Sequence, residues 1–121
     1  MNDRTLTRAE LQLMQILWDK GEAFVNDILD ALPEPKPAYS TVSTIVRILV
    51  SKGFVSYRSY GKSHRYYPLI SRQEYTSQFM MGVRDVLFGG SNVSMLSFFA
   101  QRERLSGRER RELIGMLEDM E

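Results

Sequence analysis

The residues whose types most clearly suggest a binding function are basic side chains that follow one another without an intervening acid. Residues 35–73 contain seven lysines and arginines and no aspartate or glutamate, although the whole chain carries 16 basic and 15 acidic residues. A local excess of positive charge inside a near-neutral protein is typical of a surface that meets a polyanion, nucleic acid above all. The alternative is chance clustering of basic residues on a solvated face.

A predicted helix that begins near Tyr39 or Ser40 and continues to Val50 lies within this basic stretch. One face is apolar at helical spacing, and the opposite face carries small hydroxyls and a single arginine. Small side chains allow a close approach to base edges, and arginine can pair with O6 and N7 of guanine. We expect DNA bases to be read by Tyr39, Ser40, Thr41, Ser43, Thr44 and Arg47. The alternative is an ordinary surface helix rich in serine and threonine.

Two segments rich in aromatic and β-branched residues follow this helix, Phe54–Tyr60 and His64–Leu69. The turn-forming residues Gly61-Lys62-Ser63 between them predict a β-hairpin. Contacts with the DNA backbone are expected from Lys52, Arg58, Lys62, His64 and Arg65. No carboxylate adjoins His64, the only histidine, so a phosphate or solvent contact is favoured over a catalytic role.

Several classes of chemistry are excluded by what the sequence lacks. Cysteine is absent, which removes disulfides, thiolate metal sites and cysteine nucleophiles. No glycine-rich loop of the phosphate-cradling kind is present. We therefore expect a protein that is not an enzyme and that uses no cofactor and no metal. The longest apolar runs span only a few residues, so we expect no membrane insertion and a cytoplasmic location.

The elements that must position the basic hairpin precede it along the chain. Thr7 and Glu10 have the spacing of a capping box and predict a helix that ends at Gly21. A short helix within Phe24–Leu32 and a proline-rich connector lead to the basic helix. Three helices followed by a hairpin is the order of a winged helix-turn-helix. We predict a mainly α, α+β fold whose DNA-binding domain covers residues 1–70.

Residues 71–121 have a different character and are predicted to form a helical dimerisation domain. Ser71 with Glu74 and Ser106 with Glu109 each have capping-box spacing, and Gly89-Gly90 ends the first of these helices. About 50 residues bury too little surface to be stable alone. We expect a symmetric homodimer, with packing onto the first domain as the alternative. The predicted dimerisation residues are Tyr75, Phe79, Val83, Leu87, Leu96, Phe99, Leu113 and Leu117.

Five stretches of the sequence carry a family resemblance. They read LTRAELQLMQILWDKG, YSTVSTIVRILVSKGFV, GKSHRYYPL, LFGGS and LSGRERRELIGMLEDME. In order and spacing the chain resembles the penicillinase and methicillin-resistance repressors, the BlaI/MecI type, which regulate antibiotic resistance. The resemblance implies a homodimer that binds a palindromic operator in double-stranded DNA and represses its own operon.

The resemblance also implies how repression ends. A membrane-bound metalloprotease sensor starts induction, and the repressor is cut in its dimerisation region, at a position that matches Phe98–Phe99 here. Familiar members have asparagine where this chain has Phe98, and longer basic residues at the positions of Ser40 and Ser43. An alternative function is a winged-helix adaptor that binds another protein and no specific DNA.

Overall fold

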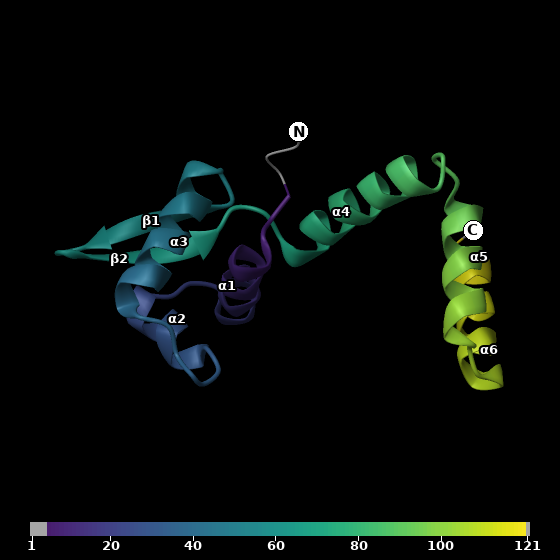
Figure 1. The fold of residues 1–121 in the computed structure, drawn as a ribbon, viewed down its shortest axis with the longest axis horizontal. Helices are drawn as coiled ribbons and strands as arrows, with labels where there is room; N and C mark the ends of the chain where they lie inside the picture. The colour runs from purple at the N-terminus through teal and green to yellow at the C-terminus, as the bar shows by residue number, and fades with distance from the viewer. Residues whose placement is uncertain (1–4, 121) are drawn as a thin grey trace. The chain divides into compact units, whose positions relative to one another are not determined.

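The computed structural model describes residues 5–120, which form six helices and one two-stranded sheet (Figure 1). In chain order these are α1 (Arg8–Lys20), α2 (Val25–Ala31), α3 (Tyr39–Ser51), β1 (Val55–Tyr60), β2 (Ser63–Pro68), α4 (Arg72–Leu87), α5 (Asn92–Glu103) and α6 (Gly107–Asp119). The predicted mainly α fold with a small hairpin is confirmed. The chain divides into two compact units between Phe79 and Met80. No helix among the described residues has the length and apolarity to cross a bilayer.

Local signals in the sequence set the ends of the first helices. The Thr7 hydroxyl accepts from the Glu10 N–H at 3.1 Å, and the Glu10 carboxylate accepts from the Thr7 N–H at 2.9 Å. This is the predicted capping box, and Gly21 ends α1 at a φ of +84°. Lys36 reaches back to the exposed carbonyls at the end of α2, with Nζ 2.6 Å from the Leu32 oxygen.

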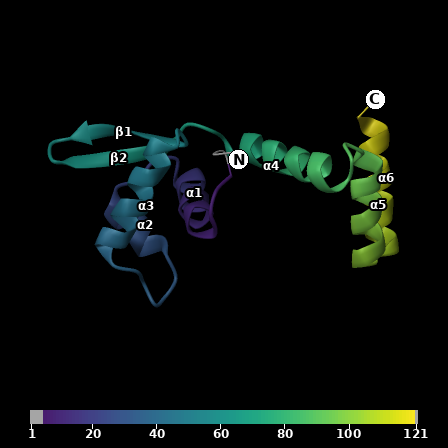
Figure 2. The same ribbon diagram turned by 45° about the horizontal axis from the view of Figure 1, so that its top comes forward.

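The hairpin pairs β1 with β2 in antiparallel register, from Val55 opposite Pro68 to Tyr60 opposite Ser63. The turn therefore consists of two residues, Gly61 and Lys62. The three-residue turn predicted from the sequence is one residue too long, because Ser63 pairs with Tyr60 as part of β2. In Figure 2 the tip of the hairpin extends to the left, beyond α3. Ala23, between α1 and α2, bridges the free edge of β2 at Tyr66.

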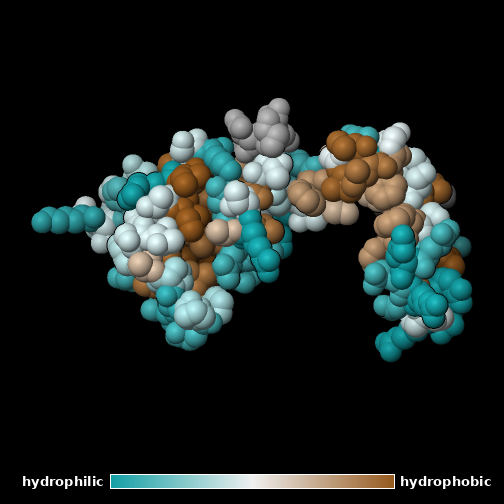
Figure 3. All heavy atoms as spheres, in the orientation of Figure 1, coloured by the Kyte–Doolittle hydropathy of each residue, from teal (hydrophilic) through white to brown (hydrophobic). Residues whose placement is uncertain are grey.

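The C-terminal unit consists of the end of α4 together with α5 and α6. Neither α5 nor α6 contains a buried residue. Large apolar side chains stay exposed instead, among them Val86 at 82%, Val93 at 77% and Phe99 at 57%. Figure 3 shows apolar side chains gathered near the end of α4. Ser91 and Ser106 cap α5 and α6, which confirms the predicted start of the last helix.

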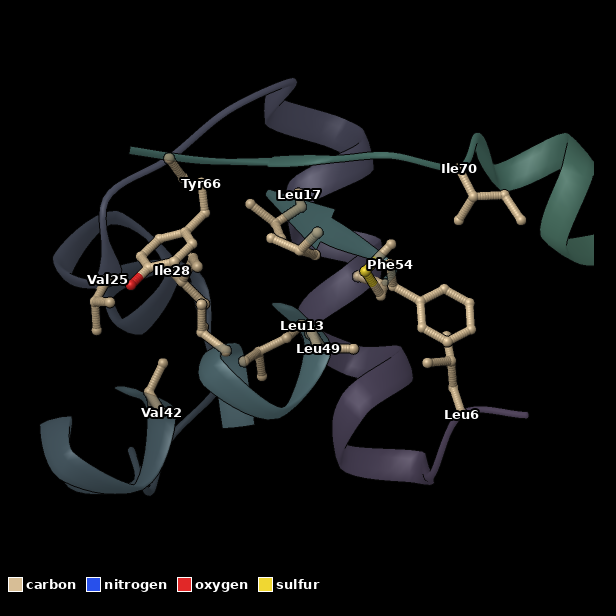
Figure 4. Packing of buried hydrophobic residues seen from close by; sticks show 14 of the residues in the cluster. Leu6, Leu13, Leu17, Val25, Ile28, Val42, Leu49, Phe54, Tyr66 and Ile70 are labelled. Atoms are coloured by element: carbon tan, nitrogen blue, oxygen red, sulfur yellow. The ribbon is translucent and has the colours of Figure 1, made fainter. Parts of the chain in front are cut away.

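The core of the N-terminal unit lies between α1, α2, α3 and the hairpin (Figure 4). Met14 and Leu17 of α1, Val46 and Leu49 of α3, and Phe54 are all fully buried. The apolar face predicted for α3 is thus the face that packs inward. Burial of a side chain of this size contributes about 1.5–3 kcal/mol, so this packing fixes how α3 presents its other face.

The core continues into the first turns of α4. Tyr75 is 6% exposed, and its hydroxyl accepts a hydrogen bond from the Leu6 N–H at 3.1 Å. Its ring lies against Phe54 and Trp18, with centroid distances of 6.0 and 6.1 Å. The Trp18 Nε1–H donates to the Ile70 carbonyl at 2.8 Å. Tyr75 is therefore a core residue of the first unit, and its buried ring is not available to a dimer interface.

An ion pair ties the start of α1 to the end of α3. Glu10 is 5% exposed, and its carboxylate lies 2.8 Å from the Lys52 Nζ. Burial raises the pKa of Glu10, but hydrogen bonds from Lys52 and from the Thr7 N–H outweigh burial and hold that pKa below its ordinary value. Lys52 therefore stabilises the fold as the counter-ion of a buried carboxylate.

We predict that Glu10→Gln lowers the free energy of unfolding of the N-terminal unit by about 1–2 kcal/mol at neutral pH. Glutamine keeps the capping geometry and loses only the ion pair with Lys52. Because the folded-state pKa is depressed, the advantage of the original protein should fade as the pH falls through that pKa.

Denaturant unfolding followed by Trp18 fluorescence measures this difference, since Trp18 is the only tryptophan. The matched control is Glu109→Gln, which changes a capping box with no ion pair among residues 5–120. Equal transitions for the original protein and Glu10→Gln at neutral pH would contradict the assigned role.

Candidate nucleic-acid interface

On the exposed face of α3, two of the four predicted hydroxyls lie against Arg47. The guanidinium donates to the Ser43 hydroxyl at 3.0 Å and to the Thr44 hydroxyl at 3.4 Å. Thr44 in turn donates its only hydroxyl hydrogen to the Ser40 carbonyl at 2.9 Å. Thr44 is thus occupied in holding Arg47, and the exposed arginine keeps further N–H donors that these two bonds do not use.

An open groove of about 500 Å³ adjoins this face of α3. It is lined by residues at the start of α2, at the start of α3 and at the tip of the hairpin: Phe24, Val25, Asn26, Asp27, Tyr39, Ser43, Tyr60, Lys62, Ser63, His64 and Tyr66. The groove therefore brings Ser43 of the helix and Lys62 of the hairpin to one surface. Asp27 also faces it, with its carboxylate accepting from the Phe24 N–H at 2.9 Å.

A second, smaller hollow of about 290 Å³ joins Arg47 to the inner face of the hairpin. His64 stacks on Tyr57 there, with ring centroids 4.2 Å apart and planes 10° apart. Tyr66 lies beside them and is 7% exposed. Burial raises the pKa of Tyr66 more than the charge of Arg47 lowers it, so the phenol stays neutral. The aromatic rings give the Arg47 side chain a rigid neighbour.

Arg58 and Arg65 occupy the other face of the hairpin. The two are directly opposite in the strand register, one position out of phase with Tyr57 and Tyr66. Both contact Glu22, at 3.6 Å from Arg58 and 3.3 Å from Arg65. The carboxylate comes from the segment before the Ala23 bridge, which is remote from the hairpin in sequence. Arg58 and Arg65 were predicted to contact the DNA backbone, but within the protein both already have Glu22 as an acidic partner.

The remaining basic residues of the 35–73 stretch either have a partner within the protein or lack an acidic one. Lys36 caps α2, Lys52 pairs with Glu10, and Arg72 pairs with Asp19 at 2.8 Å. Within residues 5–120, Lys62 has no acidic partner. Of the predicted backbone contacts, Lys62 and His64 face the groove, whereas Lys52, Arg58 and Arg65 are engaged elsewhere.

Sequence reasoning missed several residues of this surface. Tyr57 could have been found, because strand alternation places it on the same face of the hairpin as His64. Phe24 and Glu22 had no such signal, because they reach the hairpin only through the nonlocal bridge at Ala23.

The predicted dimerisation residues other than Tyr75 are half-buried or exposed within one chain. Val83 and Leu113 are half-buried, and the rest are exposed: Phe79, Leu87, Leu96, Phe99 and Leu117. Phe98 and Phe99, the implied cleavage position, lie inside α5 with 51% and 57% of their surface exposed.

Comparison with known proteins places these features in a family. Residues 6–119 match the family model described as penicillinase repressor. The chain belongs to the penicillinase repressor family. The penicillinase repressor of Bacillus licheniformis is 25% identical over 115 residues, covering 94% of this chain and 90% of that protein. The methicillin resistance regulatory protein MecI of Staphylococcus aureus is 27% identical over 120 residues, covering 97% and 98%.

A solved structure supports the fold of the N-terminal unit. The DNA-binding domain of the repressor BlaI superposes with a TM-score of 0.53 at 23% identity, covering 61% of this chain and 92% of that domain. This neighbour supports the winged-helix fold, and membership of the penicillinase repressor family makes the chain a repressor of the BlaI/MecI type, a role that is not enzymatic.

We predict opposite roles for two lysines of this repressor. Lys62→Ala should weaken binding to operator and unrelated duplexes alike and flatten the dependence of log affinity on log salt by about one unit per subunit. Lys52→Ala should leave that slope unchanged and reduce stability, because it removes the partner of Glu10.

Fluorescence anisotropy titrations at several salt concentrations measure both slopes. Trp18 fluorescence confirms that each variant is folded at the temperature used. If the slope of log affinity against log salt is unchanged in Lys62→Ala, Lys62 does not contact phosphate. If that slope is flattened in Lys52→Ala, Lys52 does contact phosphate, and its assignment to the fold alone is wrong.

Proposed function

We propose that the repressor binds a palindromic operator upstream of its own operon as a homodimer, in the cytoplasm. The α3 helix enters the major groove, and the tip of the hairpin lies on the adjacent backbone. The observation that carries this proposal is the Arg47 guanidinium, held by two α3 hydroxyls beside the groove that also contains Lys62. A donor held in one place loses little freedom when it pairs with a base.

The small size of the neighbouring side chains supports this geometry. Ser40, Ser43 and Thr44 have short side chains that leave this part of the α3 backbone free to approach base edges closely, and the longer Arg47 extends beyond them. Arginine in this position favours guanine, whose O6 and N7 accept two parallel hydrogen bonds. Ser43 and Thr44 then act chiefly by positioning the arginine, so both contribute to its choice of base.

Exposed apolar surface in the C-terminal unit supports homodimerisation. The proposed dimerisation domain, residues 71–121, includes α5 and α6, which bury no residue within one chain. Leu87, Leu96, Phe99 and Leu117 are 46–71% exposed, which is unfavourable in water unless another surface covers them. A second copy of the chain is the proposed partner, because two-fold symmetry matches two inverted half-sites of an operator.

Induction is proposed to occur by proteolysis within α5, with a membrane-bound metalloprotease sensor as the upstream partner. A protease needs an extended substrate, whereas Phe98 and Phe99 are helical here. Cleavage therefore requires local opening of α5, which contains no residue buried within one chain. Loss of this helix would separate the two DNA-binding units without altering either.

A winged-helix adaptor that binds another protein is the competing function. An electrophoretic mobility shift with the DNA upstream of the chain's own operon separates the two. Binding that survives excess unrelated duplex supports the repressor, and its absence supports the adaptor.

We predict that Arg47→Ala costs about 1–3 kcal/mol of operator binding and relaxes the base preference at one position in each half-site. Thr44→Val should lose a smaller part of the same preference, because it removes one of the two hydroxyls that hold the guanidinium. A double-mutant cycle on single-base operator variants measures the coupling. Additive effects of the two substitutions would contradict the positioning role of Thr44.

We predict that ending the chain after Gly90 yields a monomer whose operator affinity is at least about 100-fold lower. The reading surface stays intact, so affinity for an isolated half-site should remain that of the full-length protein. Sedimentation and anisotropy measure the two properties. A truncated chain that keeps full operator affinity would separate dimerisation from DNA binding and defeat the coupling.

A further inference from the structure

We call the face of the hairpin that carries Arg58 and Arg65 its outer face. An acid from the segment after α1, Glu22, lies against this face and has no part in the proposed DNA binding. One carboxylate oxygen of Glu22, Oε1, lies 3.6 Å from the Arg58 Nη1 and 3.3 Å from the Arg65 Nε. This single oxygen thus faces two guanidinium groups at once. The arginine side chains remain 59% and 40% exposed, so a solvent-borne anion has access to both.

The geometry of this contact is loose. The Glu22 Oε1 atom is buried, yet none of the described residues donates a hydrogen bond to it. Attraction to the two arginines is therefore electrostatic, without the directional hydrogen bonds that make a strong arginine–carboxylate pair. A phosphate can accept two parallel hydrogen bonds from a guanidinium, so it competes well against such a partner.

Arg65 lies beside the groove between α3 and the hairpin tip, the two elements that the proposed function assigns to DNA. The Arg65 guanidinium lies 5.7 Å from the centre of the Phe24 ring, and Phe24 lines the groove. Phe24 also meets Tyr60, a groove residue on the same face of the hairpin as Arg58. Arg58 itself rests on the ring of Tyr67 at 4.5 Å. The Arg65 guanidinium thus lies near a ring that lines the groove, and the Arg58 guanidinium lies over the ring of Tyr67 on the same face of the hairpin.

We propose that Glu22 is a counter-charge that restrains Arg58 and Arg65 and so lowers the sequence-independent part of the affinity for duplex DNA. The proposal rests on the proposed function, because it assumes that α3 and the hairpin tip bind a duplex. Phosphate contacts contribute affinity for every sequence, and each one steepens the salt dependence. By holding two arginines back, Glu22 leaves a larger share of binding to the base contacts of α3.

The test is Glu22→Gln, which keeps the shape of the side chain and removes its charge. Affinity for an unrelated duplex and for the operator should rise by the same factor, roughly threefold, because exposed ion pairs are weak. The slope of log affinity against log salt should steepen by about one unit per subunit. Anisotropy titrations of the full-length protein at several salt concentrations give both values.

Two further variants make the result specific. Asp30→Asn has the same effect on net charge at an exposed acid whose side chain has no ion pair among residues 5–120, and it should change affinity less. In a chain that carries Arg58→Ala and Arg65→Ala, Glu22→Gln should produce no gain. A gain that persists there would show a general charge effect and overturn the proposal.

The other outcomes are equally decisive. Unchanged affinity in Glu22→Gln would mean that the acid does not restrain the arginines, and reduced affinity would mean that it positions them for phosphate. Either result overturns the proposal while the original protein still binds its operator. If the original protein binds no operator, the proposed function itself fails, so the two failures are distinguishable.

Discussion

Opposite charges inside the N-terminal unit decide which of its basic residues are available to a ligand. Glu10, Glu22 and Asp19 come from the acidic first part of the chain, and each meets basic residues of the 35–73 stretch. The fold brings these segments together around the core of α1, α3 and the hairpin. Among the basic residues of that stretch, as the structure describes it, Arg47 on α3 and Lys62 at the hairpin tip neither pair with an acid nor cap a helix, and the proposed DNA surface is built on these two.

Local patterns in the sequence predicted the fold well. The capping boxes at Thr7 and Ser106 and the apolar face of α3 depend on residues a few positions apart, and all three are confirmed. The roles of the basic residues were harder to predict, since they depend on contacts between distant segments. Lys52 meets Glu10 only after α1 packs on α3, so the count of charges along the chain overstated the cationic surface.

The two units of the chain differ in how far they bury their apolar side chains. The first unit buries Phe54, Tyr75 and their neighbours within one chain, so a complete core supports its proposed DNA-binding surface. The second unit leaves Leu87 and Phe99 exposed, which suits a surface that a second copy completes. Stability and base reading would thus belong to the first unit, and operator affinity to the pairing of two chains.

Amide NMR spectra recorded during titration with the upstream duplex test the central claim most directly. If one surface of α3 and the hairpin tip receives DNA, the largest shifts will fall in residues 39–47 and 61–64. Smaller shifts are expected around Lys36 and Lys52, whose charges are used inside the fold. Largest shifts in α5 and α6, with α3 unchanged, would contradict the account.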